Sequence, residues 1–187
     1  MFIKNILLIS LIVNSLFVWT DNPGGKPAND TNYPSPVKSE KLMFYVQRSH
    51  NKNTIAYDLN MISNGKLNTD EPIHPYWIRF EEGGIKQELS FIQRKFAYGL
   101  DCELVDKAKG KYSVYFVCYK KRNMYLMRVG KDNNYHVCMQ INGIPSIINR
   151  IYFKYEGGPF WFPVVRYVDL SGTEIASGKE ITERFIP

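Results

Sequence analysis

The chain has 187 residues, of which 44% are hydrophobic and 22% are charged. This balance is typical of a globular protein and excludes a chain that is disordered throughout. The formal net charge of +6 is modest and mixed in sign along the sequence, so we expect no nucleic-acid partner. Tyr and Phe are abundant, with 13 and 11 copies, and aromatic side chains favour β-strands.

The first residues have the layout of a secretory signal. Lys4 precedes an apolar run from Ile6 to Trp19, and Asp21 begins an abrupt polar break. The run is shorter than the roughly 20 apolar residues that a helix needs to cross a bilayer. We therefore expect residues 1–20 to be an export signal and the chain to have no transmembrane span. No Ala-x-Ala cleavage signal is present, and an uncleaved N-terminal anchor is the alternative.

Residues 21–40 differ in composition from the rest of the chain. They contain four prolines among Gly, Asn, Asp and Ser and have few apolar residues. Such a segment cannot bury enough apolar surface to offset the entropy lost on ordering. We expect a flexible linker over 21–40, followed by a single β-rich domain over 41–187.

Alternation of apolar and polar residues begins at Lys41. Residues 42–47 and 55–61 alternate on either side of a turn at 49–53, which predicts a β-hairpin. A third strand is expected near 76–80. The pattern then changes, because Leu89, Ile92, Phe96 and Ala97 recur at helical spacing. This spacing predicts one amphipathic helix over about 86–98, packed with its apolar stripe against the sheet.

The remainder of the chain again has the pattern of strands and turns. Residues 111–121 and 124–129 flank a predicted tight turn at Arg122-Asn123, and Asn142-Gly143 is the strongest two-residue hairpin signal. Turn signals recur about every 8–12 residues, as in β-sandwiches and barrels. The predicted fold class is mainly β, an antiparallel sandwich or partly closed barrel with one packed helix.

The cysteines and histidines form no recognisable site. Cys102, Cys118 and Cys138 lack metal-site spacing. They are either small buried side chains or one disulfide with a leftover thiol. The three histidines fall in different predicted elements, so no metal site or cofactor is expected.

Signatures of catalysis are equally sparse. No Gly-x-Ser-x-Gly motif is present. Asp58 and the pair Glu81-Glu82 could supply carboxylates for sugar hydrolysis, but acidic residues on the polar face of a strand are common. Catalytic residues remain unknown, and the sequence favours a protein that is not an enzyme.

Two aromatic clusters are more suggestive. His74-Pro75-Tyr76-Trp77 and Phe160-Trp161-Phe162-Pro163 each place Trp beside Pro where a strand meets a loop. Rings at strand ends can stack on sugars or line an apolar pocket, and they can equally fill the core. We regard His74, Tyr76, Trp77 and Trp161 as candidate ligand-binding residues.

Three motifs carry a resemblance to a known family. They are residues 47–53 with Tyr57-Asp58, then 76–79, then 92–99. In order and spacing they resemble domain-of-unknown-function family forty-eight-thirty-three, a group of small exported bacterial proteins. The resemblance implies export to the periplasm or cell surface and a single domain, but it implies no activity. It nominates six positions without roles, namely Arg48, Asn51, Tyr57, Asp58, Trp77 and Tyr98. Of these, Arg48, Asn51, Tyr57 and Asp58 join the candidate ligand-binding residues.

These observations leave three functional hypotheses. The first is a non-catalytic binding or envelope-associated module that contacts a glycan, lipid or other envelope component through Trp77 and Trp161. The second is a periplasmic hydrolase in which Asp58, His74 and Glu81 converge in a cleft. The third is a structural subunit of a surface assembly.

Overall fold

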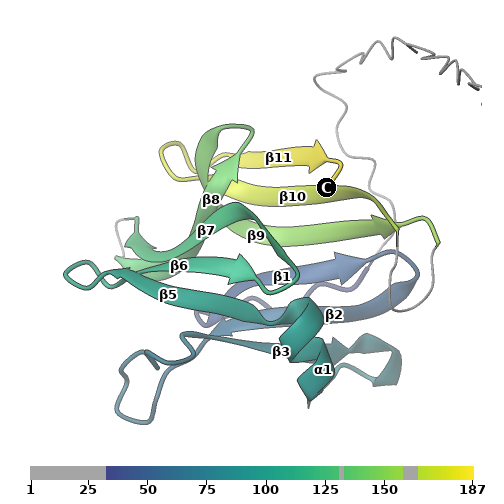
Figure 1. Cartoon of the computed structure of the whole chain (residues 1–187), viewed down its shortest axis with the longest axis horizontal. Coiled ribbons are helices and arrows are strands. Elements are labelled where there is room, and N and C mark those ends of the chain that lie inside the picture. Colours follow the sequence, from purple (N-terminus) through teal and green to yellow (C-terminus); the bar gives the residue numbers. More distant parts are fainter. Residues whose placement is uncertain (1–32, 131–132, 158–163) are drawn as a thin grey trace, which may run out of the picture.

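The structure is a computed structural model that describes residues 33–130, 133–157 and 164–187 (Figure 1). The predicted signal segment, most of the predicted linker and Trp161 lie outside these ranges. Residues at the start of the described chain contact the domain: Gln47 Nε2 donates to the Pro34 carbonyl at 3.0 Å. Contacts of the domain therefore begin before residue 41.

The domain is built almost entirely from strands, as predicted. Among the described residues, the strands are interrupted by short helical segments, namely η1 (Phe80–Glu82), α1 (Phe91–Gln93) and the π-helical η2 (Arg94–Tyr98). The strands are β1 (Leu42–Arg48), β2 (Asn51–Leu59), β3 (Ile73–Arg79), β4 (Ile85–Glu88), β5 (Leu100–Asp106), β6 (Lys111–Phe116), β7 (Tyr119–Val129), β8 (Asn134–Ile141), β9 (Ile144–Tyr155), β10 (Val165–Glu174) and β11 (Glu180–Phe185).

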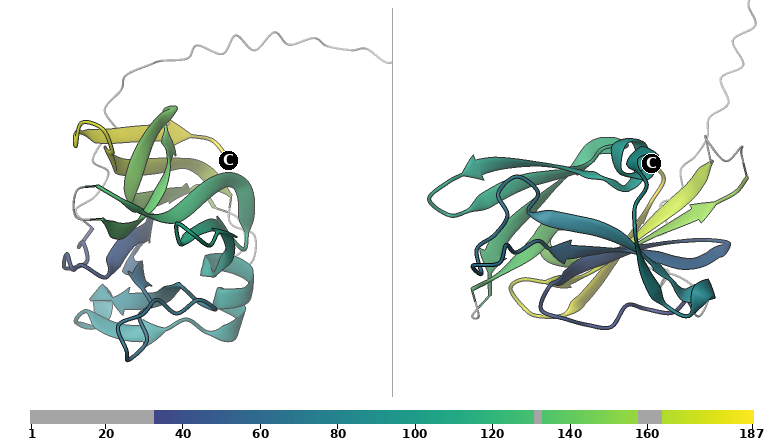
Figure 2. Two further views of the ribbon diagram at one scale, coloured as in Figure 1. Left: turned by 90° about the vertical axis from the view of Figure 1, so that its left-hand side faces the viewer. Right: turned by 90° about the horizontal axis from the view of Figure 1, so that it is seen from below.

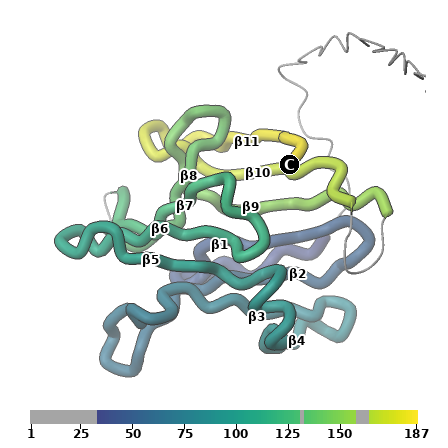
Figure 3. Tube along the Cα trace, in the orientation of Figure 1, coloured from purple at the N-terminus to yellow at the C-terminus, as the bar shows by residue number. Residues whose placement is uncertain are grey.

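The strands form one curled sheet that branches at β9. Its order is β4-β3-β2-β1-β9-β8-β7-β6-β5, with β10 and β11 added beside β9. The first half of β9 pairs with β8, while Arg150–Phe153 pairs in parallel with β1. The two arms of the sheet curl over each other into a half-barrel (Figures 2 and 3). The parallel β1–β9 pair departs from the antiparallel prediction, because local turn signals cannot reveal a pairing between positions 105 residues apart.

The core lies between the two arms. Phe44 of β1 and Tyr57 of β2 face inward with parallel rings, 4.4 Å apart between centroids. Phe116 meets Phe44 edge-on from the opposite arm at 6.2 Å. Val114 and Leu126 of that arm are fully buried. The predicted alternation therefore places one face of each strand in a shared core.

Two turns show where the strand prediction holds and where it differs. The hairpin at Asn142-Gly143 is confirmed, with positive φ values of 49° and 75°. The turn predicted at Arg122-Asn123 is absent: both residues lie inside β7, and the chain turns instead at 117–118. Arg122 bonds Glu183 of β11 and lies 4.3 Å over the Phe185 ring. Tertiary partners thus outweigh the local turn preference of this pair.

The predicted helix is confirmed but is shorter than the sequence pattern. Residues 85–88 form β4 and pair with β3, because Gly83 and Gly84 take positive φ values of 81° that reverse the chain. Helical structure begins at Phe91 after a Ser90 capping box. The apolar stripe does not cover the sheet as predicted, since Ile92 and Phe96 are 55% and 63% exposed.

All three cysteines are free thiols, so no disulfide links them. Cys138 is buried, Cys102 is partly buried and Cys118 is exposed. Within the described ranges, no helix has the length and hydrophobicity needed to span a membrane.

Candidate functional site

The sheet separates the candidate residues onto two faces. Tyr57 of β2 and Trp77 of β3 point into the core, where both are buried. Their chain neighbours Asp58 and Tyr76 point to the outer face, as does His74. Successive side chains of a strand alternate between faces, so residues adjacent in the sequence belong to different sites.

On the inner face, four of the nominated residues meet at one end of the half-barrel. Arg48, the last residue of β1, donates a hydrogen bond from Nη1 to the Tyr98 hydroxyl at 2.5 Å. Its guanidinium carbon lies 4.8 Å from the Trp77 ring centroid and 5.7 Å from that of Tyr98. These distances are typical of cation–π contacts. We call Arg48, Tyr57, Trp77 and Tyr98 the arginine cage.

The helical segment brings Tyr98 to this position. The Tyr57 hydroxyl donates to the Tyr98 carbonyl at 2.9 Å, and Trp77 Nε1 donates to Gln93 Oε1 at 3.2 Å. The π-helical turn also requires glycine at position 99, because a Cβ there would lie 1.9 Å from the Arg94 carbonyl oxygen. Two buried side chains of the sheet and one glycine therefore fix the cage.

The charge of Arg48 is not balanced by a carboxylate among the described residues. The Nε atom of Arg48 is buried without a hydrogen-bond partner. Nη1 bonds Tyr98, and Nη2 bonds no other described residue. Burial raises the pKa of nearby Tyr155 far above its usual value, although the charge of Arg48 acts in the opposite direction. Its phenol therefore stays neutral and cannot act as a counter-ion. A partly buried cation without a counter-ion is costly, which makes Arg48 a functional candidate.

The outer face carries a separate polar group. The Tyr76 hydroxyl donates to Asp58 Oδ2 at 3.0 Å and accepts from Lys86 Nζ at 3.0 Å. Burial raises the pKa of Tyr76, while its hydrogen bond from Lys86 opposes the change. The positive charge of Lys86 therefore lies close to the negative charge of Asp58, with the Tyr76 hydroxyl bonded to both.

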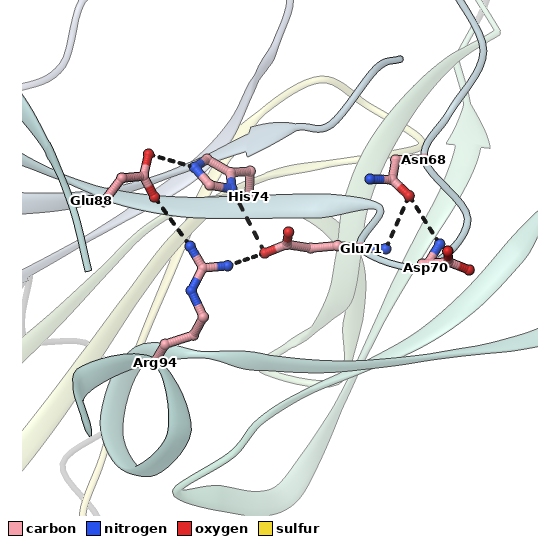
Figure 4. Close-up of polar contacts among 6 residues, drawn as sticks. All are labelled: Asn68, Asp70, Glu71, His74, Glu88 and Arg94. Atoms are coloured by element: carbon pink, nitrogen blue, oxygen red, sulfur yellow. Dashed lines mark hydrogen bonds and ion pairs between the residues drawn. The ribbon is translucent and has the colours of Figure 1, made fainter. Parts of the chain in front are cut away.

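His74 belongs to a charged network at the edge of the outer face (Figure 4). Its Nε2 lies 2.9 Å from Glu88 Oε1 and its Nδ1 lies 3.7 Å from Glu71 Oε1. Arg94 bonds both carboxylates, with 3.2 Å to Glu88 Oε2. Asn68 Oδ1 accepts from the amides of Asp70 and Glu71 and so fixes the loop. The network fastens this loop, β3 and β4 to the helical segment.

A cleft of about 280 Å³ opens beside this network. Glu71, Arg94, Lys95 and Asp101 supply its charged side chains, and Ile73 and Leu100 form part of its apolar wall. Asp101 is paired with Lys120. The carboxylate of Glu71 is already paired with Arg94. The cleft therefore offers one cation, Lys95, without a carboxylate partner in the described ranges.

The remaining candidates do not join these sites. Asn51 Oδ1 accepts from the Asn53 amide at 2.8 Å and shapes the β1–β2 turn. Glu81 bonds Asn53 at the same turn, whereas Asp58 and His74 pair across the far end of β2 and β3. In the described part of the chain, no cluster of His, Cys, Asp or Glu is suited to a metal ion.

Residues 44–184 match the family model described as Domain of unknown function (DUF4833). The chain belongs to this family. No curated protein and no solved structure gives a significant match. The match covers most of the chain and confirms the resemblance expected from the three motifs.

Within the DUF4833 domain, several residues near the sites were missed by sequence reasoning. Tyr155 joins the cage from β9, and Gln93 anchors Trp77 from α1. Glu71, Glu88 and Arg94 surround His74. None of them carries a local signal, because the curl of the sheet brings together elements that are distant in sequence.

Proposed function

We propose that this DUF4833 protein is an exported, non-catalytic binding module that receives an anionic group of its ligand at Arg48. The observation that carries the proposal is the partly buried guanidinium of Arg48, which rests on two aromatic rings and has no carboxylate partner among the described residues.

The chemistry of the cage fits a carboxylate or a phosphate. A guanidinium offers donors in a planar fork that matches either group. Tyr98 occupies Nη1, so Nη2 remains as the donor for a ligand. The partly exposed phenol of Tyr98 supplies an apolar surface beside it. An acidic glycan or another anionic component of the cell envelope combines these features.

Export is part of the proposal and rests on the sequence. The charged start, the apolar run Ile6–Trp19 and the polar break at Asp21 support it. An envelope protein would meet acidic glycans in the compartment to which such a signal directs it.

A fluorescence titration tests the proposal. The Arg48 guanidinium lies over the Trp77 ring, so an anion that pairs with this guanidinium should change the fluorescence emission of Trp77. We expect glucuronate and inorganic phosphate to shift the emission and neutral glucose to leave it unchanged. Arg48→Gln should abolish the response.

The matched control is Arg128→Gln. Arg128 also lies over an aromatic ring, with its guanidinium carbon 4.4 Å from the Tyr135 centroid, but it is remote in the sheet from the cage. The control should respond like the unmodified protein. Equal responses of Arg48→Gln and Arg128→Gln would contradict the proposal.

The geometry supports the hydrolase hypothesis less well. Asp58 and His74 are cross-strand neighbours, but Glu81 lies at the other end of β2 with Asn53. His74 instead meets Glu71 and Glu88, whose carboxylates are already engaged by Arg94.

A further inference from the structure

The helical segment presents an apolar surface outward. Phe91, Ile92 and Phe96 are 72%, 55% and 63% exposed. Together with Lys95 they occupy positions i, i+1, i+4 and i+5 of one short helical segment, and so form a single ridge. The opposite side carries Gln93 and Tyr98, which bond the sheet. We call Phe91, Ile92, Lys95 and Phe96 the apolar ridge.

We propose that the apolar ridge docks on an anionic lipid surface. An exposed helix face with aromatic and aliphatic side chains around a lysine is suited to the boundary between lipid headgroups and acyl chains. Lys95 Nζ lies 5.4 Å from the Phe91 centroid and 5.5 Å from the Phe96 centroid. When both rings enter the acyl region, the flexible lysine stem can extend its ammonium to a lipid phosphate.

The charge of Lys95 and of the whole chain favours this partner. Lys95 has no carboxylate partner in the described ranges. Arg94 bonds both Glu71 and Glu88, and Asp101, which lines the same cleft as Lys95, pairs with Lys120. The whole chain carries a formal charge of +6. A positively charged domain is drawn to anionic headgroups before its apolar side chains insert.

The path of the chain points to the same end of the molecule. The His50 amide donates to the Tyr33 hydroxyl at 3.1 Å. His50 follows Arg48 by two residues, and Arg48 bonds Tyr98 of the helical segment. The described chain thus begins close to the end of β1 on which the helical segment rests. The residues before Tyr33 include the apolar run Ile6–Trp19. In the alternative in which that run stays as an uncleaved anchor, its membrane contact and that of the ridge would add, because two weak contacts bind more firmly than one.

The test uses the full chain with vesicles of phosphatidylcholine, alone or mixed with phosphatidylglycerol. We expect Phe91→Ser/Phe96→Ser to lower partitioning to the anionic vesicles at least about tenfold. The matched control is Leu104→Ser/Val105→Ser, which removes two side chains that are 45% and 51% exposed on β5. This control should bind like the unmodified protein.

A second readout separates the ridge from the N-terminal run. Phe91→Trp and Leu104→Trp each add one fluorophore, and vesicles with brominated acyl chains quench indoles that enter the lipid. Only the emission added by Phe91→Trp should be quenched. Equal binding of the two double variants, or no quenching at position 91, would overturn the proposal. A dimer in solution that Phe91→Ser/Phe96→Ser dissociates would also overturn it, because the ridge would then bind a second copy.

Discussion

The Arg48 side chain donates a hydrogen bond to the Tyr98 hydroxyl, although the two residues lie 50 positions apart in the chain. This bond joins the end of β1 to the end of the helical segment. The backbone of Tyr98 is held in turn by the buried hydroxyl of Tyr57. The position of the Arg48 cation therefore depends on three separate parts of the sequence.

The first prediction concerns the strength of this bond. Arg48→Met and Tyr98→Phe should each destabilise the domain, and the double variant should lose less than the sum. We expect a coupling free energy of about 1–3 kcal/mol, because hydrogen bonds to charged groups are stronger than neutral ones. Urea unfolding of the four proteins measures it. Additive losses would show that the two side chains do not interact.

The second prediction concerns Tyr57. Its side chain is fully buried and its hydroxyl supplies the donor for the Tyr98 carbonyl. Tyr57→Phe should reduce the free energy of unfolding by about 1–2 kcal/mol, since it leaves a carbonyl without a partner. Tyr45→Phe is the control, because that hydroxyl bonds only an exposed serine at 3.4 Å. The control should fall within about 0.5 kcal/mol of the unmodified protein.

The third prediction concerns Gly99. An added Cβ would lie 1.9 Å from the Arg94 carbonyl oxygen, so Gly99→Ala must displace the π-helical turn that carries Tyr98. Gly65→Ala provides a comparison, because φ there is +75° but nothing lies within 4 Å of the added atom. The comparison should cost about 1 kcal/mol. Thermal unfolding should show a larger loss at position 99, and an equal loss would argue against a tight turn.

The fourth prediction concerns alkaline pH. Burial raises the pKa of Cys102 from 9.0 to about 12 and that of Cys138 from 9.0 to about 11. The unfolded chain therefore releases these protons at lower pH than the native domain does. The contribution of these two thiols to stability should be constant below about pH 9 and should fall between pH 9 and 11.

The control for this effect is Cys138→Ala, which should show a shallower decline over the same interval. Constant or rising stability between pH 9 and 11 would contradict the burial of these thiols. Raised pKa values also keep both thiols protonated and unreactive at neutral pH.

Local patterns in the sequence were sufficient for the strand content and the Asn142-Gly143 hairpin, because both depend on near neighbours. They were insufficient for residues 85–88, which have the sequence pattern of a helix start. These residues form β4 instead, because Gly83 and Gly84 reverse the chain just before them. They also failed for Arg122, whose partners Glu183 and Phe185 belong to the last strand.

The candidate residues show the same limit. Arg48, Tyr57, Trp77 and Tyr98 were nominated from motif resemblance, and the structure brings all four together. Asp58 was nominated beside Tyr57 but faces the opposite side of the sheet. Residues that are adjacent in the sequence share a strand, but the register of that strand decides which face of the sheet each side chain occupies.

The most direct test of the proposed function observes the Arg48 side chain itself. Its Nε–H group gives a separate signal in nitrogen–proton NMR spectra, and an assignment follows from the signal that Arg48→Gln removes. If an anion binds at the cage, that signal should shift in a saturable manner with glucuronate or phosphate and remain unchanged with glucose. A signal that stays in place while other arginines shift would contradict the account.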